Sequence, residues 1–352
     1  MIMNLLLLSV PLAFYADYAG YPGVWVFLLS ALALIPLAGW MGRATEELAA
    51  RVGSTAGGLL QATFGNAAEL IIAMIALSAG KVEVVKASIS GSLLSNLLLV
   101  LGLSIFMGGL KFHRQSFNKQ NAGLLATMMT LALVAFMLPA FFDMAERNYF
   151  GVDPTLPDAS FSLVVAGILI AVYIADLIFS LITHRELVGG VESVHEPEWS
   201  SKKAMSVLVA ATVGVAFMSE LLVGSLEEAT ASLGLSEFFV GIILIPLVGN
   251  SAENIAAVRF AMKNKMDLTV QIAIGASLQV AMLVAPILVI WGWISGVRLD
   301  LVFHNPLELA GLVSAVFVAN SVVRDGETHW MEGMMLLSVY ALLAFAFFFT
   351  PR

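Results

Sequence analysis

The sequence contains no cysteine and few charged residues for its length. The absence of cysteine excludes disulfides and thiolate-bound metals. Only 12% of the 352 residues are charged, whereas about a quarter of the residues in a soluble domain are. The five histidines all fall at predicted helix ends or in loops, which argues against a buried zinc site. The charges lie in loops rather than in one basic patch, so we expect no nucleic-acid partner.

Long apolar runs dominate the sequence instead, with 60% hydrophobic residues and a mean hydropathy of +0.94. A helix needs roughly 17 to 25 apolar residues to cross a bilayer, and about eleven runs meet this requirement. We therefore predict an all-α, multi-pass membrane protein in the lipid bilayer. The predicted helices lie near residues 3–17, 23–44, 54–80, 83–109, 120–142, 159–183, 201–225, 236–262, 267–294, 306–323 and 329–349.

The distribution of Lys and Arg predicts the orientation. The first apolar run lacks the positive start of a cleaved signal, so we interpret it as a retained helix. The loops on one side of the predicted membrane hold more than twice as many Lys and Arg residues as those on the other. By the positive-inside rule, the N-terminus is cytoplasmic and the C-terminus is outside. We expect the cell membrane as the location, with an acidic cytoplasmic linker at residues 185–202.

Two similar sequence motifs, which we call the acidic words, interrupt the apolar runs. They read "FGNAAEL" at residues 64–70 and "VGNSAEN" at residues 248–254. Aligning them pairs Gly65 with Gly249, Asn66 with Asn250, and Glu69 with Glu253. Further identities continue through both following helices, so we infer an internal repeat.

The repeat predicts the domain layout. Each half holds about five helices, and an odd number makes the second half enter the membrane upside down. We predict an extra N-terminal helix at 1–20, a first repeat at 21–184, the linker at 185–202 and a second repeat at 203–352. Inverted repeats of this kind are typical of transporters, with the ion site at midplane where the repeats meet.

The two words offer ligands for a cation. Residues three apart share a helix face, so Asn66 points with Glu69, and Asn250 with Glu253. The glycine in each word weakens the helix, and a proline shortly before the second word frees a backbone carbonyl. An ionised carboxylate at midplane costs at least about 2.5–3.5 kcal/mol, so a buried acid there needs a functional reason.

The helix after each word adds more oxygen atoms. "SGSLLSNLL" offers Ser92, Ser95 and Asn96, and "IGASLQVAM" offers Ser277 and Gln279. Carboxylates, amides, hydroxyls and backbone carbonyls are the ligands of hard cations such as Ca²⁺. Each Ser or Asn taken singly has an alternative role as a helix–helix contact.

Five further acidic residues allow two interpretations, and the sequence does not decide between them. They are either ordinary helix-end and locally hydrogen-bonded acids, or a proton relay and acidic mouths that concentrate cations. These residues are Glu220, Glu46, Glu47, Glu227 and Glu228.

Two nearby carboxylates in a low-dielectric site predict that the protein exchanges a metal ion for protons. Burial and mutual repulsion disfavour the state in which both are charged and empty. One Ca²⁺ or two protons neutralise the pair equally well. A carrier that changes access only when its site is neutral must therefore trade calcium for protons.

These words resemble the calcium/proton exchangers, the CAX branch of the calcium:cation antiporter superfamily. The resemblance rests on "GNAAEL" and "GNSAEN", and is supported by "GSLLSNLLLVLG" (91–102), "LITHREL" (181–187) and "NSVVRDGETHWMEGMMLLSVY" (320–340). It implies a non-enzymatic antiporter of Ca²⁺ and H⁺ without a cofactor. It implies Glu69 and Glu253 as shared ligands for the metal and the protons. It further implies that Asn66, Asn250, Ser95, Ser277 and Gln279 line the same cavity.

Rival functions remain open at this point. Sodium/calcium exchangers are similar too, but carry Ser or Thr and Pro in place of the Asn and Ala residues of both words. That departure favours protons as the driving ion. A passive cation channel is a further alternative, and the sequence does not indicate the oligomeric state.

Overall fold

The computed structural model describes residues 5–146, 155–184 and 197–350. The described chain is mostly helical, as predicted, and two strands of two residues each were not foreseen. Eight described helices are long and apolar enough to cross a membrane, or nine if one bent pair counts as a single span. The protein is therefore a multi-pass membrane protein. The prediction of eleven helices stays a prediction, because α2 (Ser9–Tyr18) and α17 (Pro306–Val322) are shorter than a full span.

The chain forms two compact units, which are described separately. Unit 1 comprises Met1–Ser88, Phe179–Glu253 and Thr350–Arg352, and unit 2 comprises Ile89–Ile178 and Asn254–Phe349. Each unit takes helices from both predicted repeats. Compact units and sequence repeats are thus different divisions of this chain.

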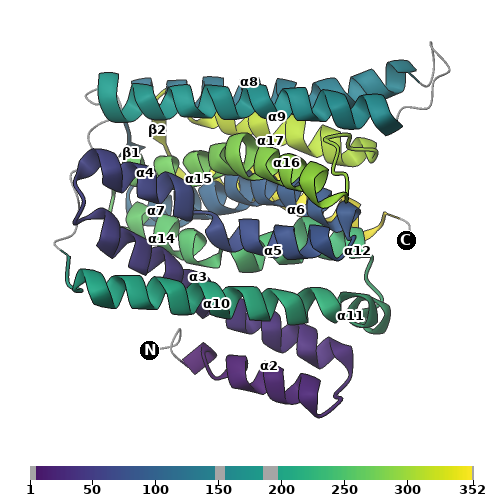
Figure 1. The fold of residues 1–352 in the computed structure, drawn as a ribbon. Helices are drawn as coiled ribbons and strands as arrows, with labels where there is room; N and C mark the ends of the chain where they lie inside the picture. Colours follow the sequence, from purple (N-terminus) through teal and green to yellow (C-terminus); the bar gives the residue numbers. More distant parts are fainter. Residues whose placement is uncertain (1–4, 147–154, 185–196, 351–352) are drawn as a thin grey trace. The chain divides into compact units, whose positions relative to one another are not determined.

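Unit 1 is built around a pair of long helices. Helix α10 packs along α3 and also against α5, and α2 packs on α3 (Figure 1). Leu34, Met41, Val215 and Met218 fill the α3–α10 contact and are at most 1% exposed. The helices of this unit are α2, α3 (Gly23–Ala49), α4 (Ser54–Phe64), α5 (Ala67–Ser78), η3 (Phe179–Thr183), α10 (Ser201–Gly224), α11 (Leu226–Leu233), α12 (Glu237–Phe239), η4 (Val240–Leu244) and α13 (Ile245–Gly249).

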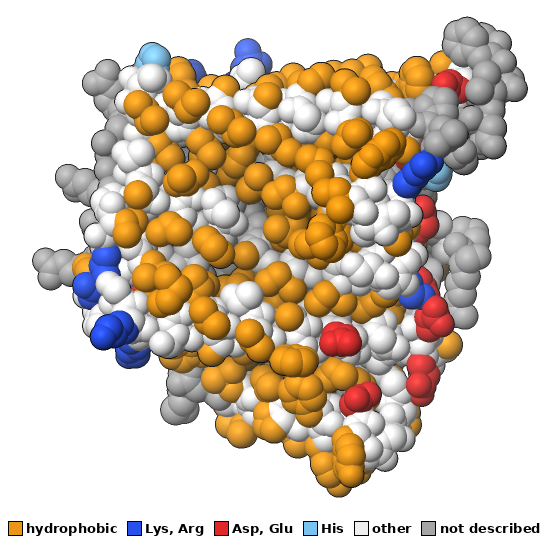
Figure 2. All heavy atoms as spheres, viewed as in Figure 1, with side chains coloured by type: hydrophobic (Ala, Val, Ile, Leu, Met, Phe, Trp, Pro, Cys, Tyr) orange, Lys and Arg blue, Asp and Glu red, His pale blue; other side chains and the backbone are white. Residues whose placement is uncertain are grey.

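The outer face of α10 shows why this unit belongs in lipid. Met205, Val209, Val213 and Phe217 recur every four residues and are each about half exposed. Residues at this spacing form one stripe along a helix. Hydrophobic side chains cover much of the face drawn in Figure 2, while the Lys and Arg side chains lie mainly at its edges. An apolar surface of this extent is stable against acyl chains rather than water.

Trp199 anchors the segment before α10 to the end of α3. Its ring stacks on Trp40 with centroids 5.6 Å apart, and Arg43 lies 4.8 Å from its centroid. Its backbone N–H donates to the buried carboxylate of Glu47 at 2.9 Å. The predicted linker at 185–202 lies largely outside the described residues, so its role remains a prediction.

Unit 2 contains the helices that follow each acidic word. They are α7 (Leu101–Lys111), α8 (Lys119–Ala145), α9 (Thr155–Ile178), α16 (Ala285–Ser295), α17 and α18 (Trp330–Phe348), together with α15 (Met266–Gln279) and the π-helices η1 (Ser95–Val100) and η5 (Val280–Val284). Helices α6 (Val82–Leu94) and α14 (Ser251–Ala261) run from unit 1 into unit 2. Strands β1 (Gln115–Ser116) and β2 (Glu327–Thr328) pair antiparallel.

Close helix packing in unit 2 depends on small residues. Helix α18 packs on α7. Helix α8 lies beside α9 (Figure 1). A Cβ added to Gly333 would lie 2.3 Å from the backbone N of Phe106. Only glycine allows the backbones of α7 and α18 to approach this closely, which is how helices associate tightly in membranes.

The N-terminus of α8 provides a stability test. The Asn118 side chain accepts hydrogen bonds from the backbone N–H groups of Gln120 at 2.9 Å and Asn121 at 3.1 Å. Replacing such a cap by alanine typically destabilises a protein by about 1 kcal/mol. We expect Asn118→Ala to lower the thermal unfolding midpoint in detergent, and Asn118→Asp to preserve it. Equal midpoints for the alanine and aspartate variants would show that the cap contributes nothing.

Candidate ion site

Both acidic words break a helix at the same point. Helix α4 ends at Phe64 and α5 begins at Ala67, while α13 ends at Gly249 and α14 begins at Ser251. Asn66 (φ −101°, ψ 24°) and Asn250 (φ −91°, ψ 6°) adopt nearly the same non-helical conformation. The predicted interruption of both helices is therefore confirmed.

The breaks place each glutamate at the start of a new helix. Glu69 lies in the first turn of α5, and Glu253 lies in the first turn of α14. The same backbone arrangement therefore places the two acids at matching positions of the two words.

The second word lies against the first glutamate. A Cβ added to Gly249 would lie 3.2 Å from Cγ of Glu69 and 3.9 Å from its Oε1. Glu253 follows Gly249 by four residues, and Glu69 and Glu46 lie close enough for their charges to act on it. Residues of two words that are far apart in the sequence thus meet within unit 1.

Burial gives this meeting point the features of a ligand site. Asn66 and Asn250 are at most 5% exposed, and both glutamates are partly exposed. Among the described residues, one carboxylate oxygen of Glu253 and the amide nitrogen of Asn250 are buried without a hydrogen-bond partner. Buried polar atoms are normally paired. The carboxylate oxygen of Glu253 can therefore take a cation, a proton or a water molecule, whereas the amide nitrogen of Asn250 is a donor that needs an acceptor such as water.

The predicted ligands of the following helices lie in unit 2. Ser92, Ser95 and Ser277 are at most 4% exposed. Ser95 begins η1, and Gln279 directly precedes η5, so both predicted repeats have a π-helix at matching places. π-Turns occur frequently at functional sites. The hydroxyl of Ser277 donates to the backbone oxygen of Ala273 at 3.0 Å. That these residues join the glutamates in one site stays a prediction.

Three of the predicted mouth acids make structural contacts. Glu47 is 1% exposed and accepts the Trp199 N–H. Glu228 accepts the backbone N–H of Gly23 at 2.8 Å and so ties α11 to the start of α3. Glu227 pairs with Lys81. Glu46, in contrast, is exposed and is the mouth acid whose charge acts on Glu253.

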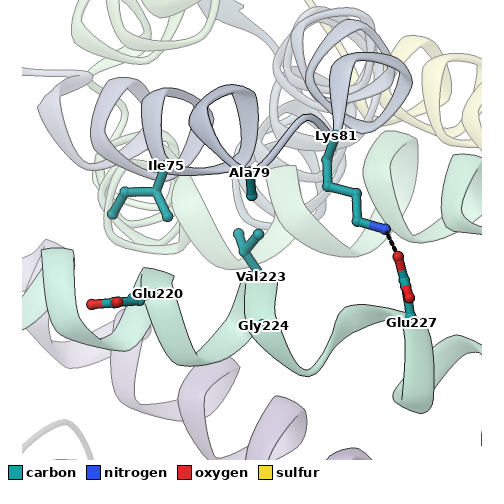
Figure 3. A pocket seen from close by; sticks show the side chains of 7 residues that line it. All are labelled: Ile75, Ala79, Lys81, Glu220, Val223, Gly224 and Glu227. Carbon is teal, nitrogen blue, oxygen red and sulfur yellow. Dashed lines mark hydrogen bonds and ion pairs between the residues drawn. The ribbon is translucent and has the colours of Figure 1, made fainter.

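Glu220 and Glu227 line one cavity of about 320 Å³, which we call the charged cavity. Figure 3 shows Ile75, Ala79 and Lys81 on one side of it, and Glu220, Val223 and Glu227 on the other. Partial burial lowers the pKa of Lys81, but hydrogen bonds to Glu227 and Glu237 more than offset this and raise it overall. The ammonium group is therefore charged at physiological pH. Sequence reasoning missed Lys81, because its partners lie far away in the chain.

Among the described residues, no group of three or more His, Asp or Glu side chains could hold a metal ion. A cation between Glu69 and Glu253 would therefore rely on two carboxylates and on neutral oxygens. Two carboxylates neutralise one divalent cation, and calcium accepts amide and carbonyl oxygens as its remaining ligands.

Broken helices that bring two acids together inside a bundle of membrane helices define an ion-coupled secondary transporter as the class of protein. The sequence profile of the sodium/calcium exchanger protein family matches residues 22–182 and 203–349. The chain therefore belongs to this family.

Individual relatives cover nearly the whole chain. A Ca(2+)/H(+) antiporter of Synechocystis sp. is 46% identical over 99% of this chain and 98% of its own length. The Ca(2+)/H(+) antiporter ChaA of Bacillus subtilis is 43% identical over 97% of this chain and 96% of its own. The solved structure of native YfkE superimposes with a TM-score of 0.86 at 40% identity, and it covers 99% of this chain and 100% of that one.

Proposed function

We propose that this protein is a secondary active antiporter that exchanges Ca²⁺ for H⁺ by alternating access. Glu69 and Glu253 form the shared site for the metal and the protons, and Asn66 and Asn250 flank them. The packing of Gly249 against the Glu69 side chain carries this proposal, because it brings the two acidic words together. A single acid in an apolar helix could have a structural role, whereas two acids that lie close together can bind the same ion.

The chemistry of the pair explains the exchange. Two adjacent carboxylates repel each other when both are ionised and empty. A bound Ca²⁺ and two bound protons both remove this repulsion, so a carrier that changes access only with a neutral site couples their movements. The expected minimum ratio is two protons for each Ca²⁺, if no further acid takes part. Glu220 and Glu46 are the acids that could add to this number.

The names of the relatives favour protons over sodium as the driving ion. Both curated relatives above are named Ca(2+)/H(+) antiporters, at 46% and 43% identity over nearly the full chain. The family name, however, refers to sodium. A Na⁺/Ca²⁺ exchanger is therefore the alternative function, and a passive cation channel is a more distant one.

We further propose an N-terminal helix followed by two inverted five-helix repeats. The family profile matches the chain twice, once on each side of the linker. The matching helix breaks at Asn66 and Asn250, and the matching π-helices η1 and η5, support the same layout. The proposed setting is the cell membrane, with the N-terminus cytoplasmic and the C-terminus outside. Ser92, Ser95, Ser277 and Gln279 are proposed to complete the ion site.

Transport in liposomes tests the proposed function. We expect purified protein to accumulate Ca²⁺ in sodium-free vesicles when an outward-directed proton gradient is imposed, because each Ca²⁺ entering is exchanged for protons leaving. The measurement is calcium uptake together with the lumenal pH, with protein-free vesicles as the control. Uptake that requires a sodium gradient would establish the alternative exchanger. Calcium flux without proton movement would indicate a channel.

A further inference from the structure

One face of α5 leads from the proposed ion site to the end of the helix. Glu69, Ile72, Ile75 and Ala79 are spaced three or four residues apart and therefore form one stripe. The distance along the helix from Glu69 to Ala79 is about 15 Å at 1.5 Å per residue. Lys81 follows at the end of this stripe, directly after the left-handed Gly80 (φ 77°).

Two cavities lie along this stripe. The first, which we call the apolar cavity, has a volume of about 190 Å³ and is bounded by α3, α5, α10, η4 and α13. Ile72, Leu222 and Val248 line it. Val248 directly precedes Gly249, and a Cβ added to Gly249 would lie 3.9 Å from Cδ1 of Ile72. The charged cavity comes next, with Ile75 and Ala79 of the same stripe in its wall. Two separate cavities thus lie along the stripe between the acidic words and Lys81.

Lys81 ties the far end of this stripe to α11 and α12. Its ammonium group donates to Glu227 of α11 and, at 3.1 Å, to Glu237 of α12. Glu237 begins the helical segment that continues through η4 and α13 to Gly249. The segment of residues 69–81 and the segment of residues 237–249 therefore meet at both ends. Glu69 lies against Gly249 at one end, and Lys81 pairs with Glu237 at the other. We call Lys81, Glu227 and Glu237 the Lys81 latch.

We propose that the Lys81 latch is the gate of an access path which runs along α5 from Glu69 to the α11 end of unit 1. The path is closed in this structure, and it opens when Lys81 leaves Glu237 and Glu227. This inference rests on the proposed antiport function, since alternating access requires one path on each side of the site. The Lys81 side chain is 18% exposed and its partners are 39% and 74% exposed. Ion pairs with such exposed partners are weak, so the latch can open without a large barrier.

The apolar cavity explains why ions do not leak along the path. Apolar walls give a hydrated cation or proton no ligands, and apolar cavities of this kind remain dry. Ions therefore cross only when the helices separate far enough to admit water. The Lys81 latch controls how far α5 and the segment from Glu237 to Gly249 separate at the α11 end of the path. At the other end, Gly249 and Glu69 remain in contact.

A single cysteine in the apolar cavity tests the latch. The natural chain has no cysteine, so Leu222→Cys gives one reporter at a position that is 2% exposed. The reporter is labelled with a membrane-impermeant thiol reagent in proteoliposomes. We expect Lys81→Met to raise the labelling rate about fivefold, because the charge pairs that hold the path closed are lost. Glu227→Gln combined with Glu237→Gln should raise it similarly, since the ammonium group then has no carboxylate partner.

Two controls separate gating from general loosening. Lys81→Arg keeps the charge, so the cysteine reporter should be labelled as slowly as in the protein with Lys81. Lys202→Met removes an exposed lysine at the other end of α10 and should also leave the rate unchanged. An unchanged rate in Lys81→Met, or an equal rise in Lys202→Met, would overturn the proposal. Calcium/proton exchange by the unsubstituted protein is measured in the same vesicles, so a failure of the antiport function is seen there independently of the labelling result.

Discussion

Glu69→Gln and Glu253→Gln should each abolish calcium/proton exchange in liposomes. Glutamine keeps the size of the side chain but removes its negative charge and its ability to bind a proton. A site with one remaining carboxylate no longer matches the charge of Ca²⁺ and no longer alternates between one Ca²⁺ and two protons. Even a residue that only supports a metal ligand changes affinity by about 10–100-fold, so losing a ligand should reduce flux by at least about 100-fold.

The matched control is Asp17→Asn, which removes an exposed acid of α2 in the same unit. It should transport normally. Calcium binding measured by isothermal titration gives a second readout, and both glutamine variants should fail to bind at concentrations that saturate the unsubstituted protein. Near-normal flux in either glutamine variant would remove that acid from the mechanism.

Enlarging Gly249 should have the next largest effect. A Cβ at this position would lie 3.2 Å from Cγ of Glu69, which is closer than ordinary van der Waals contact, so alanine must displace that side chain slightly. Overpacking costs about 1–3 kcal/mol, so we expect Gly249→Ala to lower transport about tenfold. Gly249→Val adds two more methyl groups toward Glu69 and should abolish transport.

Gly42→Val is the control for Gly249, because a Cβ at Gly42 of α3 would meet no atom within 4 Å. It introduces the same side chain into a helix of the same unit and should leave transport intact. Thermal unfolding in detergent shows whether each variant remains folded. Full transport by Gly249→Val would mean that Gly249 does not pack against Glu69 during the transport cycle.

The acidic words show how far local sequence patterns lead. Gly65, Asn66 and Glu69 predicted a helix break followed by an acid, and the structure has this arrangement at both words. The prediction worked because glycine flexibility and helix periodicity act between neighbours in the chain. The same patterns did not reveal α11, which bends 109° away from the helical segment beginning at Glu237. They also missed strands β1 and β2, which are too short to show an alternating pattern.

Long-range partners could not be predicted in the same way. Lys81 and Glu237 are 156 residues apart, and Glu47 and Trp199 are 152 residues apart. An isolated lysine or glutamate in the sequence does not indicate which of many opposite charges it will meet. Glu47 illustrates the difference, because the sequence allowed a solvated mouth acid, whereas the structure buries it against the Trp199 backbone.

The sequence by itself determined that this protein lies in a lipid bilayer, where two of its helices are broken, and that Glu69 and Glu253 stand in apolar helices. These properties follow from apolar length, helix periodicity and the free energy required to keep a carboxylate in lipid. Only the tertiary structure decided that Gly249 lies against Glu69, that Lys81 pairs with Glu227 and Glu237, and which helices form each compact unit. Apolar helix faces are nearly interchangeable in composition, so their partners are selected by the shape of the packed side chains, and shape emerges only when the whole chain has folded.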